Sequence, residues 1–317
     1  MAASSRKAIY AALAGNTLIA ITKFTAAAIT GSAAMLSEGV HSLVDTGNQI
    51  LLLLGMKRAA RPPSPDFPFG HGKEIYFWSF VVAILIFGLG AGISVYQGYQ
   101  HIIHPEPLQN VVVNYVVLGL AILFEAGAFF VAFREFSAQK GRLGYLDAVH
   151  RGKNPLLFVV LFEDGAAMLG LLAAAAGVTL AEVTGNPVFD GAASVIIGFI
   201  LAGTAIWLAY ETQGLLIGES AAGWIVARIR RVLHEDKGVK TVNEVATLHM
   251  GPEFVLVTAS VDFATSLSAD EVESCVARLT QEIKAIDASI RRVFIEAERR
   301  ADHQREMKQS VTEGETD

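Results

Sequence analysis

The first two thirds of the chain carry long apolar runs, whereas the last third mixes apolar and polar residues as a soluble domain does. A helix needs about 20 mostly apolar residues to cross the hydrocarbon core of a bilayer. We expect a membrane-spanning helix over each of the runs that reach this length: residues 8–30, 34–56, 76–101, 111–133, 155–178 and 188–210. The pattern therefore predicts an α-helical membrane protein whose residues 1–211 form a domain of six transmembrane helices.

In residues 212–300 the apolar residues recur at the short spacings that are typical of helices and strands in a small α+β domain. Glu253 to Phe263 alternates apolar and polar side chains, which is the period of a half-buried strand. Ser268, followed three residues later by Glu271, predicts a capping box at the start of a helix. With a helix over 220–234 and strands over 240–249 and 291–298, the order of elements is αββαβ. The polar residues 301–317 are predicted to be a disordered tail.

Composition narrows the class of protein. Of the 317 residues, 52% are hydrophobic and 18% are charged, whereas a soluble domain is about a quarter charged. The net charge of −6 gives no sign of a nucleic-acid partner. Cys275 is the only cysteine, which excludes an internal disulfide and a cysteine-based zinc site. No G-x-x-x-x-G-K-S/T phosphate loop is present, so we expect no ATP-driven step on this chain, and we expect no removable signal peptide.

The distribution of basic residues predicts the orientation of the chain in the membrane. Loops on one side of the predicted helices hold Arg6, Lys7, Lys57, Arg58, Arg61, Lys73, Arg134, Lys140, Arg142, Arg151 and Lys153. The loops near 31–33, 102–110 and 179–187 hold no lysine or arginine. Because short cytoplasmic loops carry the excess of positive charge, both termini are predicted to lie in the cytoplasm. We expect an integral protein of a bacterial inner (plasma) membrane.

Ionisable side chains cluster inside two of the predicted helices. Such a residue costs about 2.5–3.5 kcal/mol at the centre of a membrane helix, and it therefore marks function. In the second helix Glu38, His41, Asp45 and Asn48 share one face, and the i, i+4 spacing lets His41 and Asp45 converge. The fifth helix carries adjacent acidic residues at 163 and 164. One imidazole with several carboxylates suits a tetrahedral site for Zn²⁺ or a similar ion.

Other readings of these residues stay open. Hydrogen bonding between helices would explain Asn48, Asn16 and Lys23, and Glu38 is near enough to a helix end to reach water. Proton relay and packing both fit Glu125 and Asp190, with packing preferred. A catalytic ion held by the same cluster, with Glu163 as general base, would make the chain an intramembrane metalloenzyme. A metal-gated channel or sensor is a further alternative.

Four stretches carry a resemblance to a known family. The run S-E-G-V-H-S-L-V-D-T-G-N at residues 37–48 resembles the second-helix signature of the cation diffusion facilitator (zinc transporter) family. F-G-H-G-K-E at 69–74 is similar to its following loop, E-D-G-A-A at 163–167 to its fifth-helix motif, and L-L-I-G-E-S at 215–220 leads into its ferredoxin-like domain. The resemblance implies a homodimer that is not an enzyme and that exports divalent cations, Zn²⁺ first, in exchange for protons.

The resemblance also assigns metal ligands. It implies that His41, Asp45 and Asp164 bind the ion inside the membrane. The family's fourth ligand position falls on Val160, which cannot coordinate, so we predict a branch with a Glu-Asp motif in which Glu163 either ligates the ion or carries a proton beside it. Such a site would also admit Mn²⁺, Co²⁺, Fe²⁺ or Cd²⁺. The soluble domain lacks the family's histidine ligands, and we expect no tight zinc cluster there.

Overall fold

The computed structural model describes residues 2–108, 110–139, 144 and 155–314, and the chain divides into two units. The first holds residues 1–60 and 74–213, and the second holds residues 61–73 and 214–317. The loop 61–73 thus groups with the C-terminal unit, although the sequence assigned it to the membrane domain. The basic positions Lys140, Arg142, Arg151 and Lys153 lie outside the described residues.

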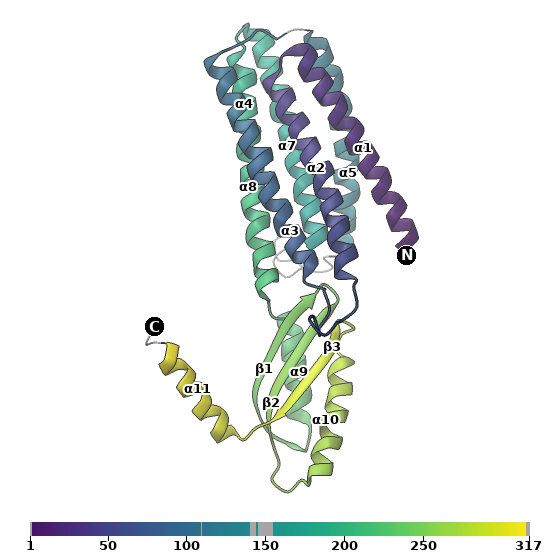
Figure 1. Cartoon of the computed structure of the whole chain (residues 1–317), viewed down its shortest axis with the longest axis vertical. Helices are drawn as coiled ribbons and strands as arrows, with labels where there is room; N and C mark the ends of the chain where they lie inside the picture. Colours follow the sequence, from purple (N-terminus) through teal and green to yellow (C-terminus); the bar gives the residue numbers. More distant parts are fainter. Residues whose placement is uncertain (1, 109, 140–143, 145–154, 315–317) are drawn as a thin grey trace. The chain divides into compact units, whose positions relative to one another are not determined.

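Helices make up the first unit (Figure 1). They are α1 (Ala2–Thr30), α2 (Ala33–Ala59), α3 (Glu74–Leu85), η1 (Ile86–Ala91), α4 (Gly92–Ile103), α5 (Val111–Gln139), α7 (Pro155–Thr184) and α8 (Val188–Ile217). Every predicted apolar run is therefore helical, with the third run divided by the π-helical turn η1. Large apolar side chains such as Leu123, 71% exposed, lie on the outside of the unit, as expected of a surface that faces lipid.

Four helical stretches among the described residues are long and apolar enough to cross a bilayer: Glu74–Ile103, Val111–Arg134, Phe158–Thr184 and Val188–Ile217. The helices α1 and α2 are not among them. In α2 the reason is chemical, because its face with Glu38, His41, Asp45 and Asn48 lowers its mean hydropathy. The polar residues that suggest a function are thus the ones that lower the hydropathy by which a membrane-spanning helix is recognised.

A tight turn joins α1 to α2. Gly31 has a φ of 71°, a left-handed conformation that glycine adopts at little cost. Ser32 then caps α2, since its Oγ accepts a hydrogen bond from the Met35 amide at 3.1 Å. The two helices pack along each other, and α2 also contacts α3, α4 and α7. This central position of α2 surrounds its polar face with protein.

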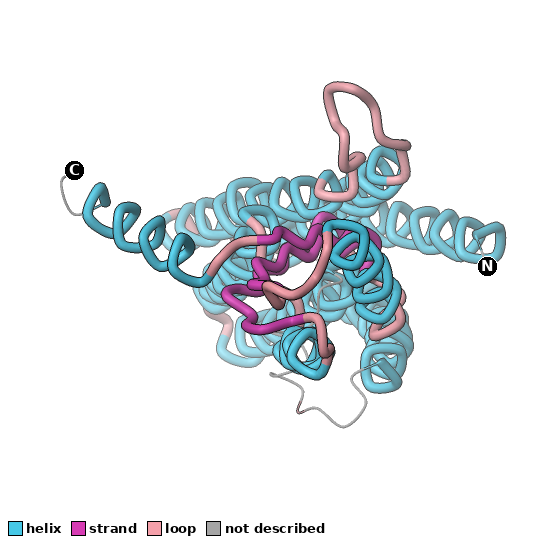
Figure 2. Tube along the Cα trace, turned by 90° about the horizontal axis from the view of Figure 1, so that it is seen from below, coloured by secondary structure: helices cyan, strands magenta, loops and turns pink. Residues whose placement is uncertain are grey.

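The second unit has the predicted αββαβ order. Its elements are α9 (Gly223–Glu235), β1 (Val239–Gly251), β2 (Phe254–Phe263), α10 (Ala269–Lys284) and β3 (Ile290–Ala297). The central strand β2 runs antiparallel to β1 and parallel to β3. Figure 2 shows α9 and α10 on the same side of the strands, where Ile229 and Leu279 pack on Val257 in one core. The predicted capping box of Ser268 and Glu271 is present.

The C-terminal segment differs from the predicted disorder. Residues Arg300–Gly314 form the helix α11. Its first turn is held by His303, whose Nδ1 lies 2.9 Å from Glu298 Oε2, and by an ion pair of 3.4 Å between Arg305 and Asp302. Pairs three residues apart lie on one helix face and stabilise it. The polar composition that suggested disorder is therefore that of a helix exposed to water.

Candidate metal site in the membrane domain

The centre of the site is the pair formed by His41 and Asp45 on α2. His41 is 1% exposed, and the Asp45 side chain is 14% exposed. Their Nδ1 and Oδ1 atoms lie 3.6 Å apart, too far for a good hydrogen bond. Within the described part of the chain, neither His41 nitrogen nor Asp45 Oδ1 has a hydrogen-bond partner. Buried polar atoms without partners are rare and call for an explanation.

A cation fits this pair. Zinc binds imidazole nitrogen at about 2.0–2.1 Å and carboxylate oxygen at about 2.0–2.2 Å. Two atoms 3.6 Å apart can therefore both contact one ion. The unpartnered nitrogen and oxygen atoms are donors of the type that Zn²⁺ prefers. The local geometry on α2 thus agrees with a metal ion as the missing partner.

The neighbouring helix α7 brings Glu163 towards this face. Asn48 Nδ2 on α2 donates a hydrogen bond of 2.8 Å to Glu163 Oε1, and Glu163 is 7% exposed. Asp164 is half-buried and lies within electrostatic reach of Asp45. Val160, one turn earlier, is apolar and 38% exposed, so it supplies no donor. The structure therefore joins Asn48 to Glu163 and His41 to Asp45 as two adjoining pairs.

The structure does not bring the four predicted ligands together as one complete metal site. Among the described residues, no group of three histidine, cysteine, aspartate or glutamate side chains has the spacing of a metal site. His41 and Asp45 meet on one helix, whereas Glu163 is held by Asn48 rather than by His41. Closing the site around an ion would require the α7 side chains to move towards His41 and Asp45 on α2.

A buried ion pair beside the site confirms the predicted hydrogen bonding of Lys23 between helices, but its partner Glu38 was not predicted. Lys23 Nζ on α1 donates to Glu38 Oε2 at 3.0 Å and to Ser42 Oγ at 2.8 Å. Both charged residues are 0% exposed, so the interpretation that Glu38 reaches water is wrong. A signal did exist. Residues equally far from the turn of a helical hairpin face each other, and position 23 is as far before the Gly31–Ser32 turn as position 40 is after it.

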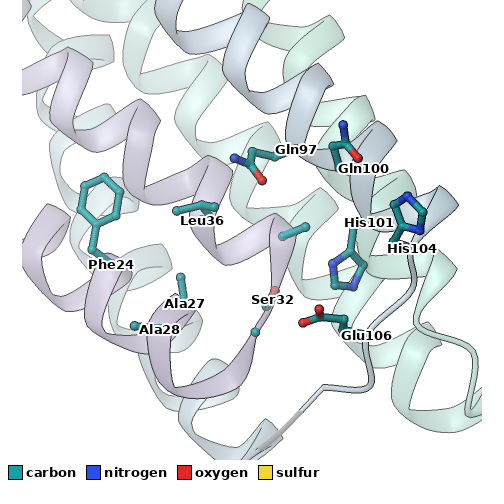
Figure 3. A pocket seen from close by; sticks show the side chains of 12 residues that line it. Phe24, Ala27, Ala28, Ser32, Leu36, Gln97, Gln100, His101, His104 and Glu106 are labelled. Carbon is teal, nitrogen blue, oxygen red and sulfur yellow. The ribbon is translucent and has the colours of Figure 1, made fainter.

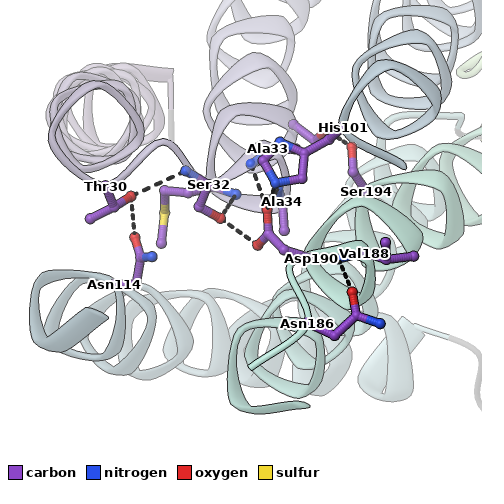
Figure 4. Close-up of polar contacts among 12 residues, drawn as sticks. Thr30, Ser32, Ala33, Ala34, His101, Asn114, Asn186, Val188, Asp190 and Ser194 are labelled. Carbon is purple, nitrogen blue, oxygen red and sulfur yellow. Dashed lines mark hydrogen bonds and ion pairs between the residues drawn. The ribbon is translucent and has the colours of Figure 1, made fainter. Parts of the chain in front are cut away.

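Asp190 at the start of α8 has a different environment, which Figure 4 shows. Its carboxylate accepts hydrogen bonds from Ser32 Oγ at 2.6 Å and from the backbone amides of Ala33 and Ala34 at 2.6 and 3.3 Å. It therefore satisfies the free amides at the N-terminus of α2. These contacts support the interpretation of Asp190 as a packing partner.

Comparison with known proteins adds an independent finding. The family model of the cation efflux transmembrane domain matches residues 9–217. The proton-coupled zinc antiporter SLC30A9, mitochondrial, of Xenopus laevis is 36% identical over 81% of this chain and 46% of its own length. Metal tolerance protein C4 of Arabidopsis thaliana is 32% identical over 82% of this chain and 57% of its own length.

A third relative is matched along most of both chains. The cation-efflux pump FieF of Shewanella oneidensis is 25% identical over 89% of this chain and 88% of its own length. The chain spans only about half the length of the Xenopus and Arabidopsis proteins. Since the family model covers more than half of the chain and a relative above 30% identity covers most of it, the chain belongs to the cation efflux family.

Proposed function

We propose that this protein transports a divalent cation, Zn²⁺ first, across a membrane in exchange for protons. The observation that carries the proposal is the buried His41–Asp45 pair, whose donor atoms lack partners although they lie at the centre of a helical membrane unit. Family membership supports transport rather than catalysis, and the Xenopus relative is named a proton-coupled zinc antiporter. Mn²⁺, Co²⁺, Fe²⁺ and Cd²⁺ are further ions that the same donors accept.

The proposed ion site consists of His41, Asp45, Asp164 and Glu163. Two of these residues already face each other, and Asn48 holds Glu163 at the face of α2. One imidazole and three carboxylates complete a coordination number of four. In this arrangement Glu163 takes the place that Val160 leaves without a donor, which defines a branch of the family with adjacent Glu and Asp ligands.

The proposed topology has six membrane helices. α1 and α2 contain 29 and 27 residues, and a rise of about 1.5 Å per residue makes each longer than the hydrocarbon core of about 30 Å. The paired charges of Lys23 and Glu38 reduce the cost of placing both helices in lipid. Both termini then lie in the cytoplasm, from which the ion is exported. We propose a homodimer in a bacterial plasma membrane, although one relative is named as mitochondrial.

Exchange follows from the chemistry of the ligands. Imidazole and carboxylate groups bind either a proton or a metal ion with the same lone pairs, so metal binding releases protons. When the ion leaves on the far side, the ligands take up protons there. A single site that opens alternately to the two sides therefore couples outward metal movement to inward proton movement.

Flux measurements in proteoliposomes test this proposal. The purified protein is reconstituted with a zinc-sensitive dye and a pH-sensitive dye inside the vesicles. We expect an imposed pH gradient to drive zinc the opposite way and an imposed zinc gradient to drive protons the opposite way, with Asp45→Ala as the inactive control. Zinc flux without proton movement would instead support a metal-gated channel, and the absence of flux for every ion of a Zn²⁺, Co²⁺, Cd²⁺, Mn²⁺ and Fe²⁺ panel would overturn transport.

A further inference from the structure

A cavity of about 520 Å³ opens at the end of the helical unit opposite to Lys57 and Arg58 of α2. It lies where α1 ends, α2 begins and α4 ends, and its polar lining comes from Ser32, Gln97, Gln100, His101, His104 and Glu106. Figure 3 shows the His101 ring and the Glu106 carboxylate pointing into this space. The mechanism proposed above uses none of these side chains.

His101 is the unusual member of the lining. Its side chain is 10% exposed, and within the described residues its Nε2 has no hydrogen-bond partner. Asp190 Oδ2 is 3.9 Å from Nε2, beyond hydrogen-bond distance. The oxygens of Asp190 already accept bonds from the first residues of α2, which fixes this carboxylate behind the ring. Asp190 therefore lies beside Nε2 without a hydrogen bond to it, and the other ring nitrogen, Nδ1, is the donor left for a ligand in the cavity.

The charges select a cation over an anion. The cavity lining contains Glu106 and no lysine or arginine, and the same holds for the three loops at this end of the unit. A helix N-terminus would ordinarily attract an anion, but Asp190 occupies that of α2. An imidazole nitrogen and a carboxylate then remain as the donors for a ligand, and this donor set suits Zn²⁺ and similar divalent ions.

We propose that His101 and Glu106 bind the transported divalent cation at this end of the membrane domain, as a second and weaker site separate from the one at His41. The inference rests on the proposed transport function and adds a second binding site along the path of the ion. No three acidic or histidine side chains among the described residues form a closed metal cage here, so water supplies the remaining ligands. A site on a transport path must release its ion, and a pair of protein ligands with water makes release easy.

Equilibrium dialysis of the purified full chain with radioactive Zn²⁺ tests the proposal by counting sites. We expect a tight and a weak class of sites in the wild type. Asp45→Asn should remove the tight class and retain the weak one. His101→Gln and Glu106→Gln should each weaken the weak class by at least the roughly 10–100-fold that loss of an outer partner costs, while leaving the tight class unchanged. The matched control is His234→Gln, since His234 is exposed on α9 in the C-terminal unit and should leave both classes intact.

A second readout requires no transport. Diethyl pyrocarbonate modifies accessible imidazoles, and mass spectrometry locates the product. In the Asp45→Asn background, Zn²⁺ should protect His101 over the concentration range of the weak class, while the exposed His234 continues to react. A weak class that persists in His101→Gln, or a His101 that Zn²⁺ does not protect, would overturn this site and leave the proposed function standing. Absence of both classes from the folded wild type would overturn the proposed function as well.

Discussion

Two aspartates of the membrane unit have opposite environments. Asp190 is fully buried, and its oxygens accept hydrogen bonds from Ser32, Ala33 and Ala34. Asp45 is also largely buried, but its Oδ1 has no hydrogen-bond partner among the described residues and faces a histidine that lacks one too. The first carboxylate joins the start of α8 to the N-terminus of α2. The second is left incomplete, which is what a site for an exchangeable ion requires.

The difference has an energetic side. A buried polar atom without a partner costs about 1–3 kcal/mol, whereas a satisfied hydrogen bond contributes about 0.5–1.5 kcal/mol. The His41–Asp45 region therefore lowers the stability of the free protein, and Asp190 raises it. Because a ligand that binds only the folded state stabilises it, metal should offset the cost at Asp45 and have little effect at Asp190.

Asp45→Ala gives the largest expected effect. It removes a proposed ligand without breaking a hydrogen bond, so zinc flux should fall by at least about 100-fold while the unfolding temperature of the metal-free protein stays the same or rises. Flux per inserted molecule in proteoliposomes and thermal unfolding by size-exclusion chromatography measure both. Normal flux in a well-folded variant would remove Asp45 from the site.

Asp190→Ala should show the opposite pattern. The hydroxyl of Ser32 and two amides of α2 lose their acceptor, and we expect a loss of about 2–4 kcal/mol in the free energy of unfolding. Asp190→Asn keeps one acceptor oxygen and should cost about half as much. Zinc affinity of the tight site should remain within a few-fold in the molecules that stay folded. Wild-type thermal stability of Asp190→Ala would contradict the comparison.

Substitution of Glu163 tests whether this carboxylate binds the ion, as proposed for Asp45, or only stabilises the helix packing, as Asp190 does. In Glu163→Gln the amide oxygen can still accept the bond from Asn48, so mainly the charge is lost. We expect zinc affinity to fall about tenfold in this variant and in Asp164→Asn, as measured by equilibrium dialysis. Retained affinity with lost proton coupling would make Glu163 a proton carrier. Unchanged affinity and coupling would place it with Asp190 as a structural residue.

A carboxylate outside the membrane gives the smallest effect. Burial alone would raise the pKa of Asp236, but hydrogen bonds from Arg278, Gly238 and Cys275 hold the pKa below its ordinary value of 3.8. A lowered pKa means that this stabilisation is complete above the unfolded-state pKa and is lost as the pH falls through the folded-state pKa. Since the Arg278 side chain is 53% exposed and its ion pair is screened by water, we expect Arg278→Gln to cause only a small loss of stability at pH 7.

Hydrogen exchange of the α10 amides in the full chain measures this loss. The difference between the wild type and Arg278→Gln should shrink as the pH falls below about 4. A difference that is independent of pH would show that Arg278 stabilises the domain by packing rather than through the charge of Asp236.

Local patterns predicted the elements well, because they depend on neighbouring residues. The apolar runs are helical, the alternation of 253–263 became β2, and the Ser268 capping box is formed. The pair of His41 and Asp45 was also predicted, since an i, i+4 spacing is local. Helix α11 was missed because a polar composition fits both an exposed helix and a disordered tail.

Partners that are distant in sequence could not be read from periodicity. The bond from Asn48 to Glu163 spans 115 residues, and the one from Ser32 to Asp190 spans 158. Each depends on how helices pack, and a single sequence does not state this. For the same reason the proximity of His101 to Asp190 had no signal, since neither residue belongs to a short motif.

The ion pair between Lys23 and Glu38 also bears on how the chain enters a membrane during synthesis. A helix that leaves the ribosome with an unpaired charge at its centre partitions poorly into lipid, by about 2.5–3.5 kcal/mol. The turn at Gly31 and Ser32 lets α1 and α2 fold back on each other and neutralise both charges. The two helices should therefore insert together as a hairpin. Under this view Lys23→Leu would leave Glu38 unmatched and reduce membrane insertion of α2, an effect on biogenesis that flux assays of the purified protein would never report.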